Sequence, residues 1–298
     1  MALSEARTVP NEHDAGHGLR LDPLTLDDVP GGLARSDAAR WNQTADDWAL
    51  FIAEGRAIGY RDATGRLVAT AAALPYGDRT GWISMVLVAE AWRHRGLASA
   101  LLRECVAHLQ ALGVTPVLDA TPAGAAVYRG LGFAAGFAFE RWQSGAPFDI
   151  AIDAKALRAA EARDGAAIVA LDRAASGIER RGVLENLLAR PATRAWLGPD
   201  GRGFVVARAG RRATQVGPLV APDAGQAVAL LSAALASAGA ADGERVLLDV
   251  PESRRDIVAW LERHGFTRQR RFVRMSLGAA HPPSLGEGAC VLAGPEFG

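Results

Sequence analysis

The stretch from Met85 to Leu102 constrains the fold most, because it joins a β-like run to a helical pattern through a loop of small residues. The loop reads Arg93-His-Arg-Gly-Leu-Ala98, and its small residues at 96 and 98 let a backbone come close to a ligand. The first turn of a helix has unpaired amide N–H groups, and its dipole favours negative charge. The sequence therefore predicts a strand–loop–helix unit that holds a pyrophosphate, with Arg93 or Arg95 adding charge.

Around this unit, short β-like runs alternate with helical patterns. The expected strands are 19–24, 56–61, 67–74, 81–88, 117–119 and 133–142. The expected helices are 25–38, 45–54 with Thr44 as N-cap, 96–112 and 123–131. Turn residues separate the three strands between 56 and 88, so we expect an antiparallel meander there.

The second half of the chain repeats a pattern from the first. Asp119 and Asp249 each end a β-like run just before a proline and a helix, and a Gly-Phe pair follows each helix at Phe133 and Phe266. The two copies lie about 130 residues apart, which predicts a duplicated domain; a coincidence between two common strand–helix–strand units is the alternative. We therefore expect a flexible leader at 1–18, domains at 19–145 and 146–280, and an irregular tail at 281–298.

The composition argues against several classes of protein. Lys+Arg and Asp+Glu are both 33, so the formal net charge is zero, and the chain lacks the electrostatic footprint of a nucleic-acid or anionic-membrane binder. There are two cysteines, the N-terminus lacks an apolar signal core, and the histidines form no metal-ligand spacing. We therefore expect a cytoplasmic protein without a metal, a nucleic-acid partner or a membrane partner.

Two motifs carry a resemblance to a known family. Arg93, Gly96 and Ala98 fit the pattern Arg/Gln-x-x-Gly-x-Gly/Ala, which resembles motif A of the GCN5-related N-acetyltransferase (GNAT) superfamily. The segment 120–133, with Tyr128 three residues before Leu-Gly-Phe, looks like the family's motif B. The resemblance covers the first half of the chain, whose order of strands and helices also fits the family. It implies an α/β (α+β) fold with a mixed, mostly antiparallel sheet flanked by helices.

The second half resembles the degenerate copy found in tandem members of that superfamily. Its stretch 215–231 aligns with the loop and helix of the first half, but it lacks the Arg-x-x-Gly-x-Ala pattern, and Asp223 stands near the expected helix start. An acid there competes with a phosphate for the positive helix end. We therefore expect two GNAT-like domains, of which only the first binds coenzyme A. The last five residues, 294–298, either fold back on the site, as the ending of these relatives would, or are a cloning remnant.

The resemblance implies acetyl-CoA as co-substrate, in a cleft where the fourth and fifth strands of the first domain separate. The pantetheine arm would pair with main-chain groups of 86–88, and an N–H of this strand would polarise the thioester carbonyl. The family often has Asn seven residues before the tyrosine, whereas this chain has Thr121, whose hydroxyl can cap the helix. The residues expected at the coenzyme are Val86, Leu87, Val88, Arg93, His94, Arg95, Gly96, Leu97, Ala98, Ser99 and Thr121.

The implied reaction is direct attack by a neutral amine on the thioester. Tyr128 is expected to protonate the leaving thiolate, because phenol and thiol pKa values lie within about two units of each other. Cys105 falls on the apolar face of its helix, so we expect no acyl-enzyme. Asp119, Glu140 and a chain of water molecules are the alternatives for the base that deprotonates the amine, and each carboxylate has a structural or surface role as its own alternative.

Recognition of the acceptor is expected from early segments of the first domain and from the second domain. The expected substrate residues of the first domain are Trp41, Asn42, Gln43, Tyr76 and Trp82. Arg180 and Asp249 are expected from the second domain, with a structural ion pair or a surface role as the alternative for both. The arginines of 268–274 alternate with apolar residues, so we expect their charges on the solvated side of a strand.

These inferences predict an N-acetyltransferase that moves an acetyl group from acetyl-CoA to a primary amine of a small molecule, as a monomer or a homodimer. A non-catalytic acyl-CoA sensor, and a transferase that acts on protein or peptide amines, are the alternatives. Tyr128 favours an enzyme over a sensor, because a protein that only binds acyl-CoA does not need a proton donor.

Overall fold

The computed structural model describes residues 18–144, 157–238, 244–278 and 284–298. In the first half of the chain the strands are β1 (Arg20–Pro23), β2 (Arg56–Arg61), β3 (Leu67–Tyr76), β4 (Thr80–Val88), β5 (Thr115–Ala120) and β6 (Phe133–Gln143). The helices are α1 (Val29–Ala38), α2 (Ala45–Glu54), α3 (Leu97–Ala111) and α4 (Pro122–Gly130), with 3₁₀ turns at Leu26–Asp28 and Glu90–Trp92.

The second half has the same kinds of element. Its strands are β7 (Arg158–Ala159), β8 (Arg194–Leu197), β9 (Phe204–Arg208), β10 (Thr214–Val220), β11 (Val246–Pro251), β12 (Thr267–Leu277) and β13 (Ala289–Val291). Its helices are α5 (Gly165–Ser176), α6 (Arg181–Ala189), α7 (Ala224–Ser237) and α8 (Arg255–Arg263), with a 3₁₀ turn at Ala162–Asp164.

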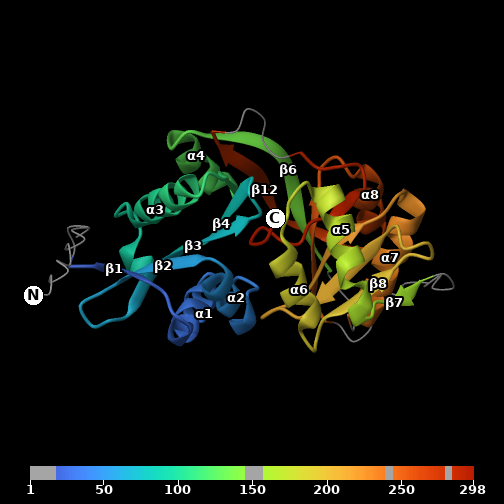
Figure 1. The fold of residues 1–298 in the computed structure, drawn as a ribbon, viewed down its shortest axis with the longest axis horizontal. Helices are drawn as coiled ribbons and strands as arrows, with labels where there is room; N and C mark the ends of the chain where they lie inside the picture. Colours follow the sequence, from blue (N-terminus) through green and yellow to red (C-terminus); the bar gives the residue numbers. More distant parts are fainter. Residues whose placement is uncertain (1–17, 145–156, 239–243, 279–283) are drawn as a thin grey trace, which may run out of the picture.

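One mixed sheet runs through both halves (Figure 1). In the described residues its strand order is β1-β2-β3-β4-β5-β12-β6-β11-β10-β9-β8-β7, with β13 paired to β10. The pairs β4–β5 and β10–β11 are parallel, and the other recorded pairs are antiparallel. The predicted mixed, mostly antiparallel α/β fold is confirmed. The predicted cap is also present, since Thr44 Oγ1 accepts a hydrogen bond of 3.3 Å from the Asp47 N–H.

The two halves exchange their last strands in the middle of the sheet, where Figure 1 shows β6 and β12 side by side. β12 of the second half pairs with β5 and β6 of the first half, and β6 pairs in turn with β11 of the second half. Each half therefore completes the sheet of the other. The predicted boundary between 19–145 and 146–280 follows the repeat along the chain, whereas the packed units cross it.

Two buried ion pairs lie at this exchange, one on each side. Arg274 on β12 donates to both carboxylate oxygens of Asp119 on β5, at 2.9 Å each. Arg141 on β6 donates to Asp249 on β11 at 2.9 and 2.8 Å. The strand register places each arginine opposite the aspartate of the other half. The expectation that the 268–274 arginines are solvated is wrong for Arg274, whose side chain is 1% exposed, because β12 is an interior strand.

Removing one partner of the buried pair between Arg274 and Asp119 is expected to destabilise the protein strongly. Arg274→Ala leaves the Asp119 carboxyl group buried and without its arginine, and such a loss costs about 3–5 kcal/mol of unfolding free energy. Arg268→Ala is the matched control on the same strand. The Arg268 side chain is 56% exposed, so its ion pairs contribute less than about 1 kcal/mol. Urea unfolding of the two variants measures both values, and equal losses would contradict the account.

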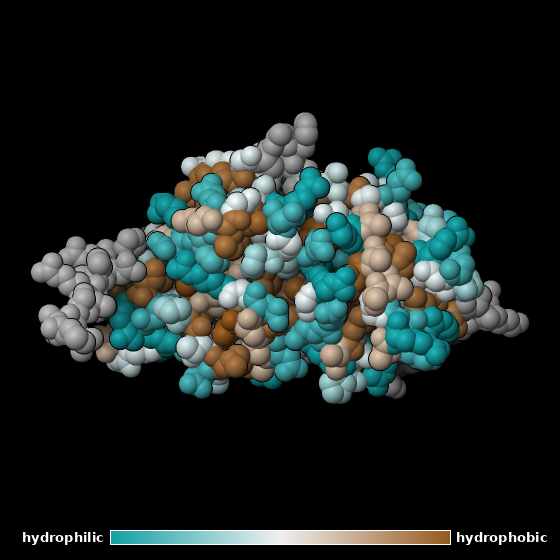
Figure 2. Space-filling view, in the orientation of Figure 1, coloured by the Kyte–Doolittle hydropathy of each residue, from teal (hydrophilic) through white to brown (hydrophobic). Residues whose placement is uncertain are grey.

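Helices cover both faces of the first-half sheet. α3 and α4 pack one face with residues such as Leu101, Cys105 and Ala125, and α2 packs the other with Trp48 and Phe51. In the second half, α7 and α8 share one core cluster and α5 belongs to another. On the face drawn in Figure 2, hydrophobic residues are interspersed with hydrophilic ones.

The C-terminal segment lies between the two halves, where Figure 1 marks the chain end. Phe297 is 0% exposed and packs in the same core cluster as residues of α2 and α6. We expected 281–298 to be irregular, but it contains the strand β13, and its last residues are buried. The predicted leader lies outside the described residues except for Gly18.

Candidate active site

The parallel strands β4 and β5 separate halfway along their length. They pair over Thr80–Trp82 with 115–117, and no pairing is recorded beyond that point. Met85 has a positive φ of 56°, and the register between β3 and β4 shifts beside it. The Thr70 hydroxyl donates to the Met85 carbonyl at 2.9 Å, which holds this irregularity in place. The main chain of residues 86–88 is therefore left beside an open cleft.

A cleft of about 620 Å³ runs from this strand edge to the start of α3. Gly96 begins the helix with a left-handed φ of 78°, and the first turn of α3 contains no acidic residue. A Cβ at position 96 would meet nothing within 4 Å, so the backbone there faces open space. The predicted coenzyme residues that line the cleft are Val86, Leu87, Val88, Arg93, His94, Gly96, Leu97, Ala98, Ser99 and Thr121. Free N–H groups in a helix turn without an acidic residue fit a pyrophosphate, although Glu90 also lines the cleft.

Arg95 is the one predicted coenzyme residue that does not line this cleft. Its guanidinium stacks over the Trp92 ring at 4.7 Å and donates to the Ala91 carbonyl at 3.2 Å. Arg93 instead lies along the cleft, with its Nε 3.4 Å from the Val88 carbonyl. The sequence left open whether Arg93 or Arg95 adds charge at the pyrophosphate. Of these two residues, the structure places Arg93 in the cleft.

This difference gives a direct test of the cleft. Arg93→Ala is expected to weaken coenzyme A binding about three- to tenfold, because an exposed charge-assisted contact is lost. Arg95→Ala is the matched control and is expected to leave the dissociation constant within about twofold. Isothermal titration with coenzyme A measures both, and a larger loss at Arg95 than at Arg93 would contradict this placement.

A second, smaller cavity of about 150 Å³ adjoins the cleft. It shares Trp41, Val86, Thr121 and Arg270 with the cleft, so the two spaces lie side by side. Its lining comes from both halves and from the C-terminal segment: Trp41, Gln43, Ile83, Ser84, Met85, Val86, Leu118, Asp119, Thr121, Tyr128, Arg141, Arg270, Phe272, Pro295 and Glu296. Four residues predicted to contact the acceptor or to act in catalysis are thus brought together here, namely Trp41, Gln43, Asp119 and Tyr128.

Tyr128 stands on α4 at the wall of this smaller cavity. Thr121 caps the helix by accepting a hydrogen bond of 3.2 Å from the Gly124 N–H, which fixes the turn below the tyrosine. The Tyr128 ring packs against Phe133 at 6.2 Å. Burial raises the pKa of the Tyr128 phenol, so its hydroxyl keeps the proton that it could donate.

The two carboxylates considered as bases are both engaged elsewhere. Asp119 lines the cavity, but both of its oxygens accept from Arg274. Glu140 lies 3.2 Å from Arg268 and is not among the cavity residues. A structural role therefore fits Asp119 and Glu140 better than the role of a general base.

Several predicted substrate residues connect parts of the protein instead of lining the cavity. The Asn42 side chain accepts from the Arg212 and Ala213 N–H groups at 2.9 and 3.0 Å and donates to the Ala213 carbonyl at 3.0 Å. Asp249 is 0% exposed, binds Arg141 and accepts a hydrogen bond of 2.9 Å from Gln215. The polar atoms of Asn42 and Asp249 are thus occupied by the protein itself, which favours the structural role for both, and their direct contact with a substrate stays a prediction.

Tyr76, Trp82 and Arg180 hold the C-terminal segment. The Tyr76 hydroxyl donates to the Phe297 carbonyl at 3.2 Å, and Trp82 Nε1 donates to the Pro295 carbonyl at 3.0 Å. Arg180 makes a buried ion pair with Asp172 at 2.8 Å and also donates to the Phe297 and Gly298 carbonyls. These three residues position the tail that contributes to the cavity wall, which favours an indirect role over the predicted contact with a substrate.

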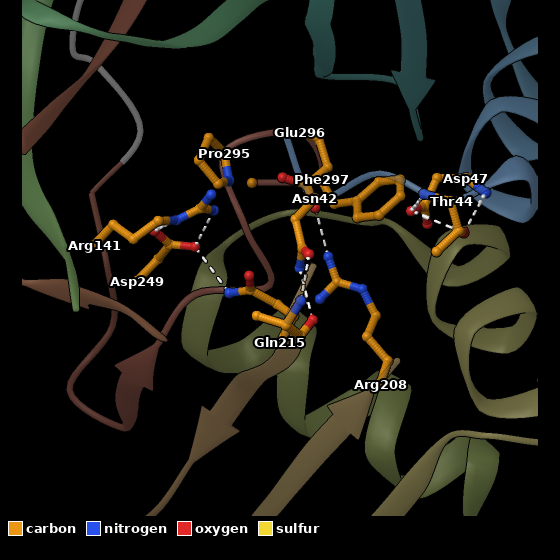
Figure 3. Close-up of polar contacts among 12 residues, drawn as sticks. Asn42, Thr44, Asp47, Arg141, Arg208, Gln215, Asp249, Pro295, Glu296 and Phe297 are labelled. Carbon is orange, nitrogen blue, oxygen red and sulfur yellow. Dashed lines mark hydrogen bonds and ion pairs between the residues drawn. The ribbon is translucent and has the colours of Figure 1, made fainter. Parts of the chain in front are cut away.

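Glu296 is the cavity residue that sequence reasoning missed. The tail brings it to the cavity wall, as Figure 3 shows with Pro295 and Phe297 on either side of it. Its side chain is 8% exposed and pairs with Arg208 at 2.5 Å. Burial raises the pKa of the Glu296 carboxyl, against the opposing charges of Arg208 and Arg141. The only signal in the sequence was the resemblance of the last five residues to an ending that folds back.

Two general features of the described residues bear on the site. No group of three or more His, Cys, Asp or Glu side chains in the described part of the chain is placed to hold a metal ion. Among the same residues, no helix combines the length and apolar character needed to cross a bilayer.

The fold is shared with solved acetyltransferase structures. A candidate acetyltransferase from Pyrococcus horikoshii aligns with a TM-score of 0.79 at 18% identity, over 99% of both chains. A tandem GNAT protein from the clavulanic acid biosynthesis pathway aligns with a TM-score of 0.62 at 16% identity, over 87% of this chain and 98% of that one. A GCN5-related N-acetyltransferase from Kribbella flavida gives a TM-score of 0.56 at 24% identity, over 87% and 70%. None of the curated proteins matches the sequence significantly.

Family models identify both halves of the chain. The model described as Acetyltransferase (GNAT) family matches residues 26–133, and the one described as Acetyltransferase (GNAT) domain matches residues 168–287. The chain therefore belongs to the GNAT superfamily, with two GNAT domains in tandem. This confirms the family that the two motifs predicted.

Proposed function

We propose that this protein transfers an acetyl group from acetyl-CoA to the primary amine of a small molecule by direct attack. The observation that carries the proposal is that the two spaces adjoin and share wall residues. The cleft that fits a pyrophosphate lies beside the smaller cavity, and Tyr128 stands at the wall of that cavity. A thioester at the junction would meet an amine held on the other side.

The first half supplies the groups that would hold the co-substrate. The N–H groups at the start of α3 would bind the pyrophosphate, and the open edge of residues 86–88 would pair with the pantetheine arm. A main-chain N–H of Leu87 or Val88 would polarise the thioester carbonyl. Each of these donors is fixed by the backbone and needs no rearrangement when substrate binds.

The described side chains support attack without an acyl-enzyme. Cys105 is buried in the core, and burial raises the pKa of its thiol to about 12. Burial also raises the pKa of the Cys290 thiol to about 11. Neither thiol is poised as a nucleophile. The amine nitrogen would instead bond directly to the acetyl carbon while the carbon–sulfur bond breaks, and Tyr128 would give its proton to the departing sulfur.

Glu296 is our choice for the group that takes the proton from the ammonium. It is the cavity carboxylate that is not held by a two-bond arginine pair, since only its Oε1 bonds to Arg208. A raised pKa makes a carboxylate a stronger proton acceptor near neutral pH. The tail would thus complete the acceptor site of the first domain.

The second half is proposed to support this site without binding coenzyme A. The Asp223 carboxylate accepts a hydrogen bond of 2.8 Å from the Gln226 N–H at the start of α7, where a phosphate would have to bind. The edge of β10 that corresponds to the open edge of β4 is paired with β13, and the Leu292 N–H donates to the Asp249 carbonyl at 2.8 Å. The chain's own tail thus fills the space of a second pantetheine arm.

A small acceptor is favoured because three parts of the chain enclose the cavity. The first domain, β12 of the second half and the tail all contribute to its wall. A peptide would have to enter a space of about 150 Å³, whereas a small amine fits without displacing the tail.

The proposed function is tested by following free thiol release from acetyl-CoA with panels of amino acids, polyamines, aminoglycosides and peptides. We expect release that depends on one class of small amine, with an N-acetylated product identified by mass spectrometry. Acetyl-CoA binding without any amine-dependent release would support a sensor and contradict the proposal.

A further inference from the structure

We propose that the acceptor carries a carboxylate as well as its amine, and that Arg270 and Arg141 bind this carboxylate in the smaller cavity. The inference rests on the proposed function, because it names the class of acceptor for the same site. It predicts an amino acid or a similar zwitterion and argues against polyamines and aminoglycosides.

The charges around the smaller cavity are not balanced. Four charged side chains line it, and three of them have an ion-pair partner behind the wall. Asp119 is paired with Arg274, Glu296 with Arg208, and Arg141 with Asp249. Arg270 makes no ion pair or side-chain hydrogen bond with any residue that the structure describes. The cavity therefore carries one uncompensated positive charge.

Arg270 and Arg141 face each other in the register of β12 and β6, and both line the cavity. Arg270 is an exposed residue, but partial burial and the charge of Arg141 both lower the pKa of its guanidinium. An arginine nevertheless stays protonated at any physiological pH. Arg141 uses Nε and Nη2 for Asp249, which leaves its Nη1 without a bond to a described residue. A carboxylate placed there would relieve the repulsion and accept hydrogen bonds from both arginines.

The cavity lining also contains two unpartnered acceptor atoms that could bind the amine. Gln43 Oε1 and Ser84 Oγ are buried polar atoms of the cavity lining that have no hydrogen-bond partner. Gln43 is 4% exposed and Ser84 is 9% exposed. Buried polar atoms are costly unless something binds them, and these oxygens can accept from an amine. With Glu296 they offer acceptors for one end of the ligand, whereas the arginines offer donors for the other.

The charge pattern also selects against other amines. A polyamine or an aminoglycoside would bring further positive charges next to Arg270, which repels them in a partly enclosed space. A zwitterion places its negative group at the uncompensated cation and its ammonium near Glu296. The small volume favours a short distance between the two groups.

The test compares acceptors that are matched in size. Acetyl-CoA turnover is measured with L-phenylalanine, L-phenylalaninamide and phenethylamine, and with L-leucine, L-leucinamide and isoamylamine. We expect kcat/KM for the better amino acid to exceed that of its amide and its amine about tenfold or more. The amide has the more readily deprotonated amine, so intrinsic reactivity would give the opposite order.

The variant Arg270→Gln tests whether Arg270 causes the preference for an acceptor with a carboxylate. We expect it to raise KM for the amino acid about tenfold and to leave KM for acetyl-CoA within about twofold. Arg271→Gln is the matched control, because the Arg271 side chain is 49% exposed and pairs with Glu252 away from the cavity. A rise confined to the KM for acetyl-CoA would show that Arg270 binds the coenzyme and not the acceptor, which would overturn the proposal.

Calorimetry with the same ligands tests the carboxylate site separately from the transferase activity. Amino acids that bind the wild type, but not Arg270→Gln, without being acetylated would refute the transferase and support the carboxylate site. Amides or amines that are acetylated as fast as the acids would support the transferase and overturn the carboxylate site. Acids and amines that neither bind nor react would overturn it as well.

Discussion

Tyr128→Phe is expected to lower kcat by about 10²–10⁴-fold while leaving KM for acetyl-CoA nearly unchanged. The substitution removes only a hydroxyl, so the ring can keep its contact with Phe133 and the wall of the cavity keeps its shape. What is lost is the proton that the departing thiolate takes up. Steady-state kinetics with saturating acceptor measures kcat and KM separately.

A matched control exists among the three tyrosines of the chain. Tyr60 on β2 lies in the core and lines neither the cleft nor the smaller cavity, so Tyr60→Phe is expected to change kcat less than about twofold. Calorimetry with acetyl-CoA confirms that both variants still bind. An unchanged kcat in Tyr128→Phe would remove Tyr128 from the reaction.

Glu296→Gln is expected to have an effect of similar size, because it removes the proposed proton acceptor while keeping the volume of the side chain. We expect kcat/KM to fall about 10²–10⁴-fold at neutral pH. In the wild type, activity should be lost as the pH falls through the pKa of Glu296, which burial places above the ordinary range for glutamate. The variant should lose this acidic limb of the profile.

The pH profile distinguishes a chemical role of Glu296 from a structural one. Glu296→Gln leaves Arg208 without its counter-ion and can reduce stability, so thermal unfolding is measured alongside the kinetics. Glu252→Gln is the control, because Glu252 forms an exposed pair with Arg271. A variant that is slower at every pH, with the acidic limb unchanged, would assign another base.

The sequence predicted those parts of the site that depend on local pattern. The loop at 93–98 is local, since a small residue between a strand and a helix lets the backbone turn sharply, and Gly96 does so with a left-handed φ of 78°. The capped helix start at Thr44 and the turn below Tyr128 are local in the same sense. The motif could not distinguish Arg93 from Arg95, because the direction of each side chain depends on its own contacts, with the Val88 carbonyl for Arg93 and with the Trp92 ring for Arg95.

The parts that the sequence could not predict depend on contacts between distant residues. The repeat located Asp119 and Asp249. Its pattern is the same whichever half supplies the partner strand, so the exchange of β6 and β12 could not be predicted from it. Asn42 looked like a ligand residue because its partners lie about 170 residues away in the chain. Glu296 belongs to a five-residue ending without periodicity, and only its burial beside Arg208 places it at the cavity.

A single-turnover experiment with acetyl-CoA labelled in the acetyl group tests the central claim most directly. The protein is mixed with the labelled co-substrate, with and without the best amine of the panel, and quenched samples are separated into protein and small molecules. We predict that the label passes to the amine at the rate of thiol release, and that the protein carries none in its absence. Label retained on the protein without an amine, or thiol release that no amine accelerates, would contradict the account.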